Sequence, residues 1–237
     1  VALDLADAGI RTTLVEREGA LGGRAYQLSR TFKTHECKAD GCCMDYCPEC
    51  IFTPKFEEIY QSDNIEVLLK TEVESITGHP GDFHATVVQD GKKKAIDVAA
   101  IVVATGSKTF DAARIPEYGY GRYKDVVTFL DMEKGIVAAR NGVGNVVVRP
   151  SDGKAPKTIN FILCVGSRDR NKGNPHCSIV CCTYAIGQAK EIKKLNPDTE
   201  VFIHYMDLRA AYRGFEEHYE EAQKLGVRFI KGRVADV

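Results

Sequence analysis

The sequence predicts an α/β fold made of two units, each with a parallel sheet flanked by helices. Short strands rich in β-branched and apolar residues alternate with helical segments in residues 1–15 and again in residues 158–230, an order typical of parallel sheets. All nine cysteines fall into two groups, within residues 37–50 and residues 164–182. Converging thiols bind metal, form disulfides or exchange them, so these groups are the first candidates for a functional site.

Composition narrows the class of protein. The chain has 237 residues, and its 44% of hydrophobic residues suits a packed core. Its net charge is −1, so it lacks the excess of positive charge that is typical of nucleic-acid-binding proteins. It has no run of about 18 apolar residues, so we expect no membrane span. Nine cysteines in such a chain favour a reducing, cytoplasmic setting in which thiolates serve metal or redox chemistry. Because Val1 lies inside a predicted helix and Val237 inside a predicted strand, we expect a fragment truncated at both ends.

The first elements indicate a dinucleotide-binding unit. Residues 1–8 have apolar side chains at helical spacing, and Gly9 ends this helix. Residues 10–15 then form a strand that ends at Glu16. The carboxylate at this strand end accepts hydrogen bonds from ribose hydroxyls in such units, so Glu16 is a candidate cofactor-binding residue. The alternative is a solvated charge.

A glycine pair follows this strand. Gly22 and Gly23 allow the backbone to approach a phosphate or a flavin closely, and Arg24 can pair with a pyrophosphate. Arg17, next to Glu16, completes this group of candidate cofactor-binding residues.

Four further strands are expected in the first unit. They cover residues 66–73, 83–88, 94–98 and 99–106. The middle two form a hairpin around Asp90-Gly91, a common two-residue turn. The last strand is strongly apolar, so we expect it to be buried up to its final residues, Ala104-Thr105-Gly106.

The order of these motifs resembles the thioredoxin reductase and glutathione reductase superfamily of flavoproteins. The matching motifs are Leu14-Val15-Glu16, Leu21-Gly22-Gly23-Arg24, Thr71-Glu72-Val73 and Val103-Ala104-Thr105-Gly106. The resemblance implies two Rossmann-like dinucleotide-binding units and FAD as a cofactor. It places Glu16 at the adenosine ribose and the backbone of Val73 at the adenine. The turn of Ala104, Thr105 and Gly106 would lie near the pyrophosphate.

The resemblance also suggests how the chain is divided. We expect residues 1–108 to form the FAD-binding unit, with a cysteine-rich insertion at residues 37–50. Residues 109–157 would be a connection, and residues 158–237 a second Rossmann-like unit.

The second unit has its own order of strands and helices. Strands are expected at residues 158–163, 200–206 and 227–230, and helices at residues 178–195 and 215–225. The turn after the first strand reads Cys164-Val165-Gly166-Ser167-Arg168-Asp169 and contains no G-x-G-x-x-G. We therefore expect that NAD(P)H is not the direct reductant at this place.

The downstream cysteines are Cys164, Cys177, Cys181 and Cys182, spaced C-x12-C-x3-C-C. One lies at a strand end and the others near a helix start, where the helix dipole favours thiolates. Four such thiolates can surround a [4Fe-4S] cluster. Zinc is disfavoured because the group has no C-x2-C pair; a vicinal disulfide at Cys181-Cys182 and inert core thiols are further alternatives.

The upstream cysteines are Cys37, Cys42, Cys43, Cys47 and Cys50. A second [4Fe-4S] cluster would use four of them. A redox dithiol of Cys47 and Cys50 or a zinc site are the alternatives.

Within that superfamily the chain resembles the A subunit of heterodisulfide reductase and related subunits of quinone-interacting oxidoreductase complexes. The matching segments are Cys164–Arg168, Cys177–Ala185, Cys50–Lys55 and Tyr205–Arg209. The resemblance implies an FAD-containing electron-transfer subunit of anaerobic metabolism, with a [4Fe-4S] cluster on the downstream cysteines. It implies other subunits of a heterodisulfide-reductase-like complex and ferredoxin or a similar carrier as partners, with flavin-based electron bifurcation as a further function.

Two other functions compete with this one. The first is a pyridine nucleotide-disulfide oxidoreductase that uses the dithiol of Cys47 and Cys50. The second is a non-catalytic scaffold subunit held together by zinc.

Overall fold

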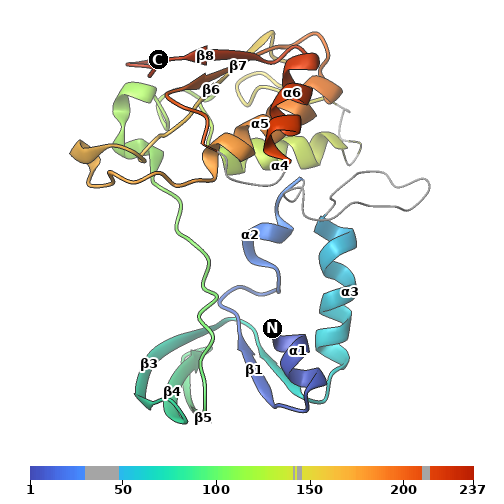
Figure 1. Ribbon diagram of the computed structural model, residues 1–237, viewed down its shortest axis with the longest axis vertical. Helices are drawn as coiled ribbons and strands as arrows, with labels where there is room; N and C mark the ends of the chain where they lie inside the picture. The colour runs from blue at the N-terminus through green and yellow to red at the C-terminus, as the bar shows by residue number, and fades with distance from the viewer. Residues whose placement is uncertain (30–47, 141, 143–145, 210–213) are drawn as a thin grey trace. The chain divides into compact units, whose positions relative to one another are not determined.

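The computed structural model describes residues 1–29, 48–140, 142, 146–209 and 214–237 (Figure 1). This part of the chain forms two compact units. The first contains Val1–Gln27 and the described residues of Cys47–Ser107, and the second contains the described residues of Leu28–Tyr46 and of Lys108–Val237.

A parallel strand pair is the centre of the first unit. Strand β1 (Thr12–Val15) pairs with β2 (Ile65–Leu68). Helices α1 (Ala2–Asp7) and α3 (Pro48–Gln61) contact these strands. Their apolar side chains meet in a small core, whose buried members are Ala6, Leu21, Ile59 and Ile65. The predicted helix and strand at the start of the chain are confirmed.

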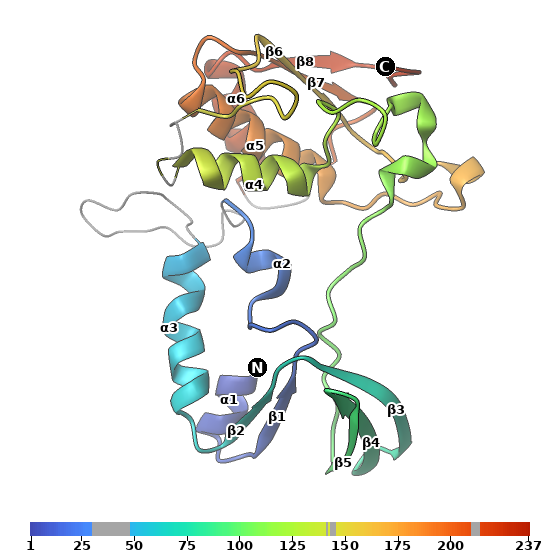
Figure 2. The same cartoon turned by 180° about the vertical axis from the view of Figure 1, so that it is seen from behind.

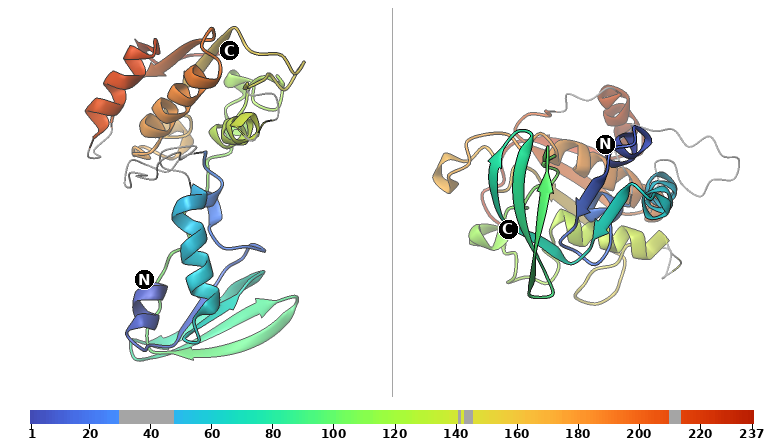
Figure 3. Two further views of the ribbon diagram at one scale, coloured as in Figure 1. Left: turned by 90° about the vertical axis from the view of Figure 1, so that its right-hand side faces the viewer. Right: turned by 90° about the horizontal axis from the view of Figure 1, so that it is seen from below.

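The first unit also contains a three-stranded antiparallel sheet (Figure 3). Its strands are β3 (Thr71–His79), β4 (Asp82–Gln89) and β5 (Lys92–Val98). Asp90 and Gly91 both have positive φ, of 48° and 76°, between β4 and β5, as a tight hairpin turn requires. The predicted hairpin is confirmed.

Two predictions about this unit are wrong. Residues 66–73 are two strands rather than one, because Lys70 has a positive φ of 50° and turns the chain between β2 and β3. Residues 99–106 form no strand and are mostly exposed, with Val102 at 63% and Val103 at 78% exposure. This segment would be buried only if it paired with a neighbouring strand. In the described part of this unit the parallel sheet consists of β1 and β2 alone, so the segment stays exposed.

The second unit has the predicted parallel sheet. Strands β6 (Thr158–Ile162), β7 (Glu200–Tyr205) and β8 (Arg228–Lys231) lie in the order β6-β7-β8. Helix α5 (Cys181–Leu195) connects β6 to β7, and α6 (Phe215–Lys224) connects β7 to β8. The α/β fold class expected from the sequence is therefore confirmed.

Helix α4 (Phe129–Arg140) was not expected. Residues 109–157 were predicted to be a connection, but this helix packs against α5 on the side of the sheet where α6 also lies (Figures 1 and 2). Its start carries a reciprocal cap: the Thr128 backbone N–H donates to the Asp131 carboxylate (3.0 Å), and the Asp131 N–H donates to the Thr128 hydroxyl (3.3 Å). This T-x-x-D pattern could have revealed the helix.

The remaining regular elements of the described chain are single turns. They are α2 (Gly23–Tyr26), η1 (Ala112–Arg114), η2 (Pro116–Tyr118) and η3 (Arg170–Lys172). In the part of the chain that the structure describes, no helix has the length and apolar character needed to cross a membrane.

A buried polar network joins α4 to α5. The Glu133 carboxylate accepts from the Ser29 backbone N–H (2.6 Å) and from Gln188 Nε2 (2.8 Å). Arg140 pairs with the buried Glu191 and donates to the Ser29 carbonyl (2.7 Å). Buried charges are tolerated only when they are paired in this way, so the network fixes how the two helices pack.

Helix α4 should contribute measurably to stability. Ile136 is fully buried in the second core, so Ile136→Ala should lower the free energy of unfolding by about 2–5 kcal/mol through lost burial and a cavity. Ile230→Ala, at a residue 41% exposed, is the matched control and should cost about 1 kcal/mol or less. Urea denaturation followed by circular dichroism measures both; equal losses would show that α4 is not part of the core.

Candidate functional sites

The first candidate site lies where β1 ends. The Glu16 backbone N–H donates to the Leu68 carbonyl, and the Glu16 carbonyl accepts from the Thr71 N–H, both at 2.9 Å. Glu16 is therefore held between the end of β2 and the start of β3. Its carboxylate accepts from the Glu18 N–H (2.8 Å), which leaves further acceptor capacity for a ligand.

The glycine pair shapes the backbone beside this carboxylate. Gly22 has a φ of 108°, and an added Cβ would lie 2.7 Å from Tyr26 Cβ and 2.9 Å from Phe56 Cζ, so no larger residue fits. Gly23 also has positive φ, but nothing lies within 4 Å of the place where its Cβ would be. The Gly23 backbone is thus open to an approaching group.

Arg24 brings two distant motifs together. Its Nη1 donates to the hydroxyl of Ser107 (3.4 Å), 83 residues farther along the chain. Ser107 directly follows Ala104-Thr105-Gly106, and nothing lies within 4 Å of the position of a Gly106 Cβ. An exposed guanidinium and an open glycine turn therefore lie side by side, an arrangement suited to a pyrophosphate.

The two remaining candidates differ in their surroundings. Val73 lies in β3, two residues after the Thr71 contact to Glu16, next to a bulge between Val73 and Ser75; it is 48% exposed. Arg17 is exposed and pairs with Glu18 at 3.1 Å. Arg17 thus forms an ion pair at the surface, whereas Val73 lies near the end of β1, where the candidate cofactor site is.

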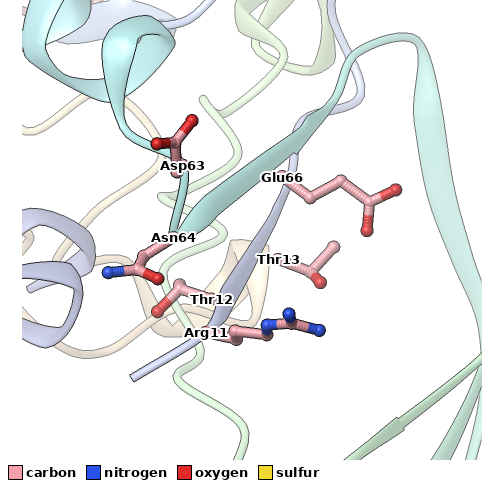
Figure 4. Close-up of a pocket in the computed structure, with 6 residues that line it drawn as sticks. All are labelled: Arg11, Thr12, Thr13, Asp63, Asn64 and Glu66. Atoms are coloured by element: carbon pink, nitrogen blue, oxygen red, sulfur yellow. The ribbon is translucent and has the colours of Figure 1, made fainter. Parts of the chain in front are cut away.

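A polar cavity of about 230 Å³ lies at the opposite end of this strand pair (Figure 4). Its lining residues are Arg11, Thr12, Thr13, Asp63, Asn64 and Glu66. They belong to the starts of β1 and β2 and to the residues just before them. In open α/β sheets ligands bind at the carboxyl ends of strands, so this cavity is distinct from the candidate cofactor site at Glu16.

The second candidate site lies in the second unit, where β6 ends and α5 begins. Cys164 follows β6 and Cys181 is the first residue of α5. The side chains of Cys164 and Cys182 both lie within hydrogen-bonding reach of the Cys181 thiol. Cys177 lies near enough to Cys182 to contribute to raising the pKa of Cys182. The structure thus brings the predicted group together, and all four thiols are free.

The helix start differs from the prediction. Helix α5 begins at Cys181 rather than at Ser178, and Ile179 just before it has a positive φ of 65°. Cys177 therefore lies outside the helix and does not share a helical face with Cys181. Cys177 instead lies in the turn that precedes the helix, where the Ile179 N–H donates to Cys177 Sγ (3.3 Å).

Charge within the sulfur group is uneven. Hydrogen bonds from Cys164 and then from Cys182 lower the pKa of Cys181. The pKa of Cys164 and of Cys182 is raised, first by the hydrogen bond to Cys181 and then by burial. One thiolate is thus stabilised by two thiol donors.

The described thiols are not arranged as in a loaded metal site. Among the described residues, no three His, Cys, Asp or Glu side chains stand in the geometry of a bound metal ion. The thiols of Cys164 and Cys182 instead lie within hydrogen-bonding reach of Cys181. A cubane holds its ligands farther apart than hydrogen-bonded thiols, so the side chains must separate to bind one.

The upstream cysteines remain a prediction. Cys37, Cys42, Cys43 and Cys47 lie outside the described residues. Cys50 lies in the first turn of α3, and the position of its side chain is likewise outside the description.

Comparison with known proteins defines the class. Residues 1–148 match the family described as pyridine nucleotide-disulphide oxidoreductase. The chain therefore belongs to this family of oxidoreductases, in agreement with its α/β fold, and membership supports FAD as the cofactor.

Particular relatives are more informative. The chain is 34% identical over 313 residues to the second iron-sulfur A subunit of CoB–CoM heterodisulfide reductase from Methanopyrus kandleri, covering 100% of this chain and 46% of that protein. It is 33% identical, with the same coverage, to the A subunit of H(2):CoB-CoM heterodisulfide,ferredoxin reductase from Methanothermobacter thermautotrophicus. The resemblance to the A subunit of heterodisulfide reductase is thus confirmed. The chain spans about half the length of these relatives.

Solved structures are more distant. Bacillithiol disulfide reductase Bdr from Bacillus cereus aligns with a TM-score of 0.48 and 13% identity, covering 98% of this chain and 63% of that chain.

The sulfur geometry predicts a thiol that ionises at low pH in the metal-free chain. Because two thiol donors stabilise its thiolate, Cys181 should keep its full rate of iodoacetamide labelling down to a lower pH than in a Cys164→Ala/Cys182→Ala variant. Removing the donors raises the pKa of Cys181, so its labelling rate should begin to fall at a higher pH. Mass spectrometry follows the labelling as a function of pH, with Cys177 as the internal control. The same pH dependence at Cys181 in both proteins would contradict the arrangement.

Proposed function

We propose that this chain is the FAD-binding electron-transfer part of a heterodisulfide-reductase-like protein, and that Cys164, Cys177, Cys181 and Cys182 hold one [4Fe-4S] cluster. The observation that carries this proposal is the convergence of these thiols at the end of β6 and the start of α5. The names of the relatives, which describe an iron-sulfur subunit and a ferredoxin reductase, support it.

The surroundings of the sulfurs fit a cluster. Two backbone N–H groups point at sulfur, from Ile179 to Cys177 (3.3 Å) and from Arg209 to Cys182 (3.4 Å). A buried Nη1 of Arg168 meets no hydrogen-bond acceptor among the described residues. Cluster sulfides and thiolates accept hydrogen bonds, so a bound [4Fe-4S] cluster would supply an acceptor for this Nη1.

The same turn is unsuited to a pyridine nucleotide. Gly166 lies in the turn after β6, and the ring of Phe110 occupies the space where a side chain at this position would lie. An added Cβ would be 2.1 Å from that ring. The ring thus covers the backbone that a pyrophosphate would have to approach. This supports an electron route through the sulfur site rather than direct reduction by NAD(P)H.

The first unit would hold FAD through complementary groups. The Glu16 carboxylate would accept from ribose hydroxyls, while Arg24 and the open backbone of Gly23 and Gly106 would bind the pyrophosphate. FAD, when bound, supplies both one-electron and two-electron chemistry. No side chain is required as a general acid or base for such electron transfer.

Partners and setting follow from the same proposal. Other subunits of a heterodisulfide-reductase-like complex and ferredoxin or a similar carrier would exchange electrons with this chain, in a reducing, cytoplasmic setting. Flavin-based bifurcation and a second cluster on Cys37, Cys42, Cys43, Cys47 and Cys50 are extensions of the proposal. The relatives whose names include ferredoxin support the choice of carrier.

Flavin binding should depend on the charge at residue 16. Glu16→Ala should weaken FAD binding, because each charge-assisted hydrogen bond to the ribose contributes about 1.5–3 kcal/mol, or about tenfold or more in Kd. Glu18→Ala, at a neighbouring exposed carboxylate, is the matched control and should bind FAD like the parent. Flavin fluorescence during titration gives both constants, and equal affinities would remove Glu16 from the site.

Cluster content should depend on Cys181. Cys181→Ala in anaerobically purified protein should lose about four irons and one paramagnetic signal, because one of four thiolates is missing. Flavin content is the internal control, since the flavin residues belong to the other unit. Full iron content in the variant would exclude Cys181 as a ligand and favour thiol redox chemistry at Cys181-Cys182.

A further inference from the structure

Arg168 is fixed beside the sulfur site by its own backbone. It lies four residues after Cys164 with a positive φ of 56°, a conformation that an arginine adopts only where neighbouring contacts enforce it. Its N–H donates to the His176 carbonyl (3.0 Å), which ties it to the residue just before Cys177. The side chain therefore starts from a defined point between two of the proposed cluster ligands.

An ion pair then directs the guanidinium. Arg168 Nη2 lies 2.7 Å from Asp207 Oδ2, and the arginine side chain is only 19% exposed. The guanidinium also lies within hydrogen-bonding reach of the Cys164 thiol, although its buried Nη1 meets no acceptor with full hydrogen-bond geometry in the described part of the chain. A positive charge thus faces the sulfur site with donor capacity left over.

The segment that holds Arg168 also touches a second cysteine. Cys182 Sγ lies 3.9 Å from the Asp207 carbonyl oxygen, and the Arg209 N–H donates to Cys182 Sγ (3.4 Å). Asp207 follows β7, which pairs with β6 in parallel, so its position next to the end of β6 is set by the sheet. Asp207 therefore links Arg168 to the sulfur site from both its side chain and its backbone.

We propose that Arg168, held by Asp207, is the positioning residue that raises the reduction potential of the cluster on Cys164, Cys177, Cys181 and Cys182. This inference rests on the proposed function. Reduction adds negative charge to a cluster, and hydrogen bonds to sulfur and nearby net charge set its potential. The guanidinium supplies a donor and a positive charge next to Cys164, while the more exposed Asp207 carboxylate partly offsets that charge.

Two substitutions with opposite charge effects test this. Arg168→Met removes the positive charge and the donor, so the midpoint potential should fall. Asp207→Asn keeps an acceptor for Arg168 but removes the negative charge, so the potential should rise by a smaller amount. Arg170→Met, at an exposed arginine of the same loop, is the matched control and should leave the potential unchanged.

The measurement is a redox titration of the full chain, purified without oxygen and followed by electron paramagnetic resonance. The signal of this cluster is the one that Cys181→Ala abolishes. For Arg168→Met we expect about a tenfold lower ratio of reduced to oxidised cluster at a fixed potential, which is a shift of about 59 mV for a one-electron couple. Arg168→Lys keeps the charge without the planar fork and should shift the potential less.

The outcomes separate the two proposals. Wild-type protein without iron would overturn the proposed function together with this inference. Wild-type iron content with no shift in Arg168→Met, or with shifts of the same sign in Arg168→Met and Asp207→Asn, would overturn only the role of Arg168. If Arg168→Met loads less iron, the sign of the Asp207→Asn shift decides.

Discussion

Four thiols converge at the end of β6, and the rest of the second unit depends on this arrangement. Three residues around the sulfurs, Cys164, Arg168 and Ile179, have positive φ although none is glycine. Each such residue costs about 1–3 kcal/mol and persists only where the surrounding structure enforces it. The enforcing structure is the β6–β7 pairing and the buried face of α5, where Ile186 and Ile192 are fully buried. Because this backbone strain lies at or within four residues of the cysteines, it supports a functional role for the positions of the cysteines.

The two candidate sites use different chemistry for different tasks. In the first unit an acidic strand end, open glycine backbone and a guanidinium suit a neutral ribose and a charged pyrophosphate. In the second unit free thiols, backbone N–H donors and a paired arginine suit an iron–sulfur cluster. Both sites occur where parallel strands end, which is where this class of fold binds ligands. The protein would thus set the positions and potentials of its cofactors, and the cofactors would perform the chemistry.

Local patterns could be predicted from the sequence, and non-local ones could not. The helix at the start of the chain, the Asp90-Gly91 hairpin and the β6-β7-β8 sheet follow from periodicity and turn chemistry. The exposure of residues 99–106 could not be predicted, because burial depends on a neighbouring strand rather than on the segment itself. Helix α4 had a detectable signal in Thr128 and Asp131, although the sequence around it was interpreted as a connection.

The same distinction applies to the sites. Spacing identified the thiol group, and the structure brings Cys164 and Cys182 within hydrogen-bonding reach of Cys181. The surrounding residues Arg168 and Asp207 could not be assigned from the sequence, because strand pairing brings together positions that lie 39 residues apart. The start of α5 at Cys181 likewise depends on the turn at Ile179, which no propensity predicts for a β-branched residue.

The central claim is that four cysteines, at the end of β6 and around the start of α5, hold one iron–sulfur cluster. The most direct measurement is anomalous diffraction at the iron absorption edge, from crystals of the chain prepared without oxygen. We expect a group of iron peaks bonded to the sulfurs of Cys164, Cys177, Cys181 and Cys182. Anomalous maps with no iron at these sulfurs, with zinc in its place, or with a disulfide between Cys181 and Cys182 would contradict the claim.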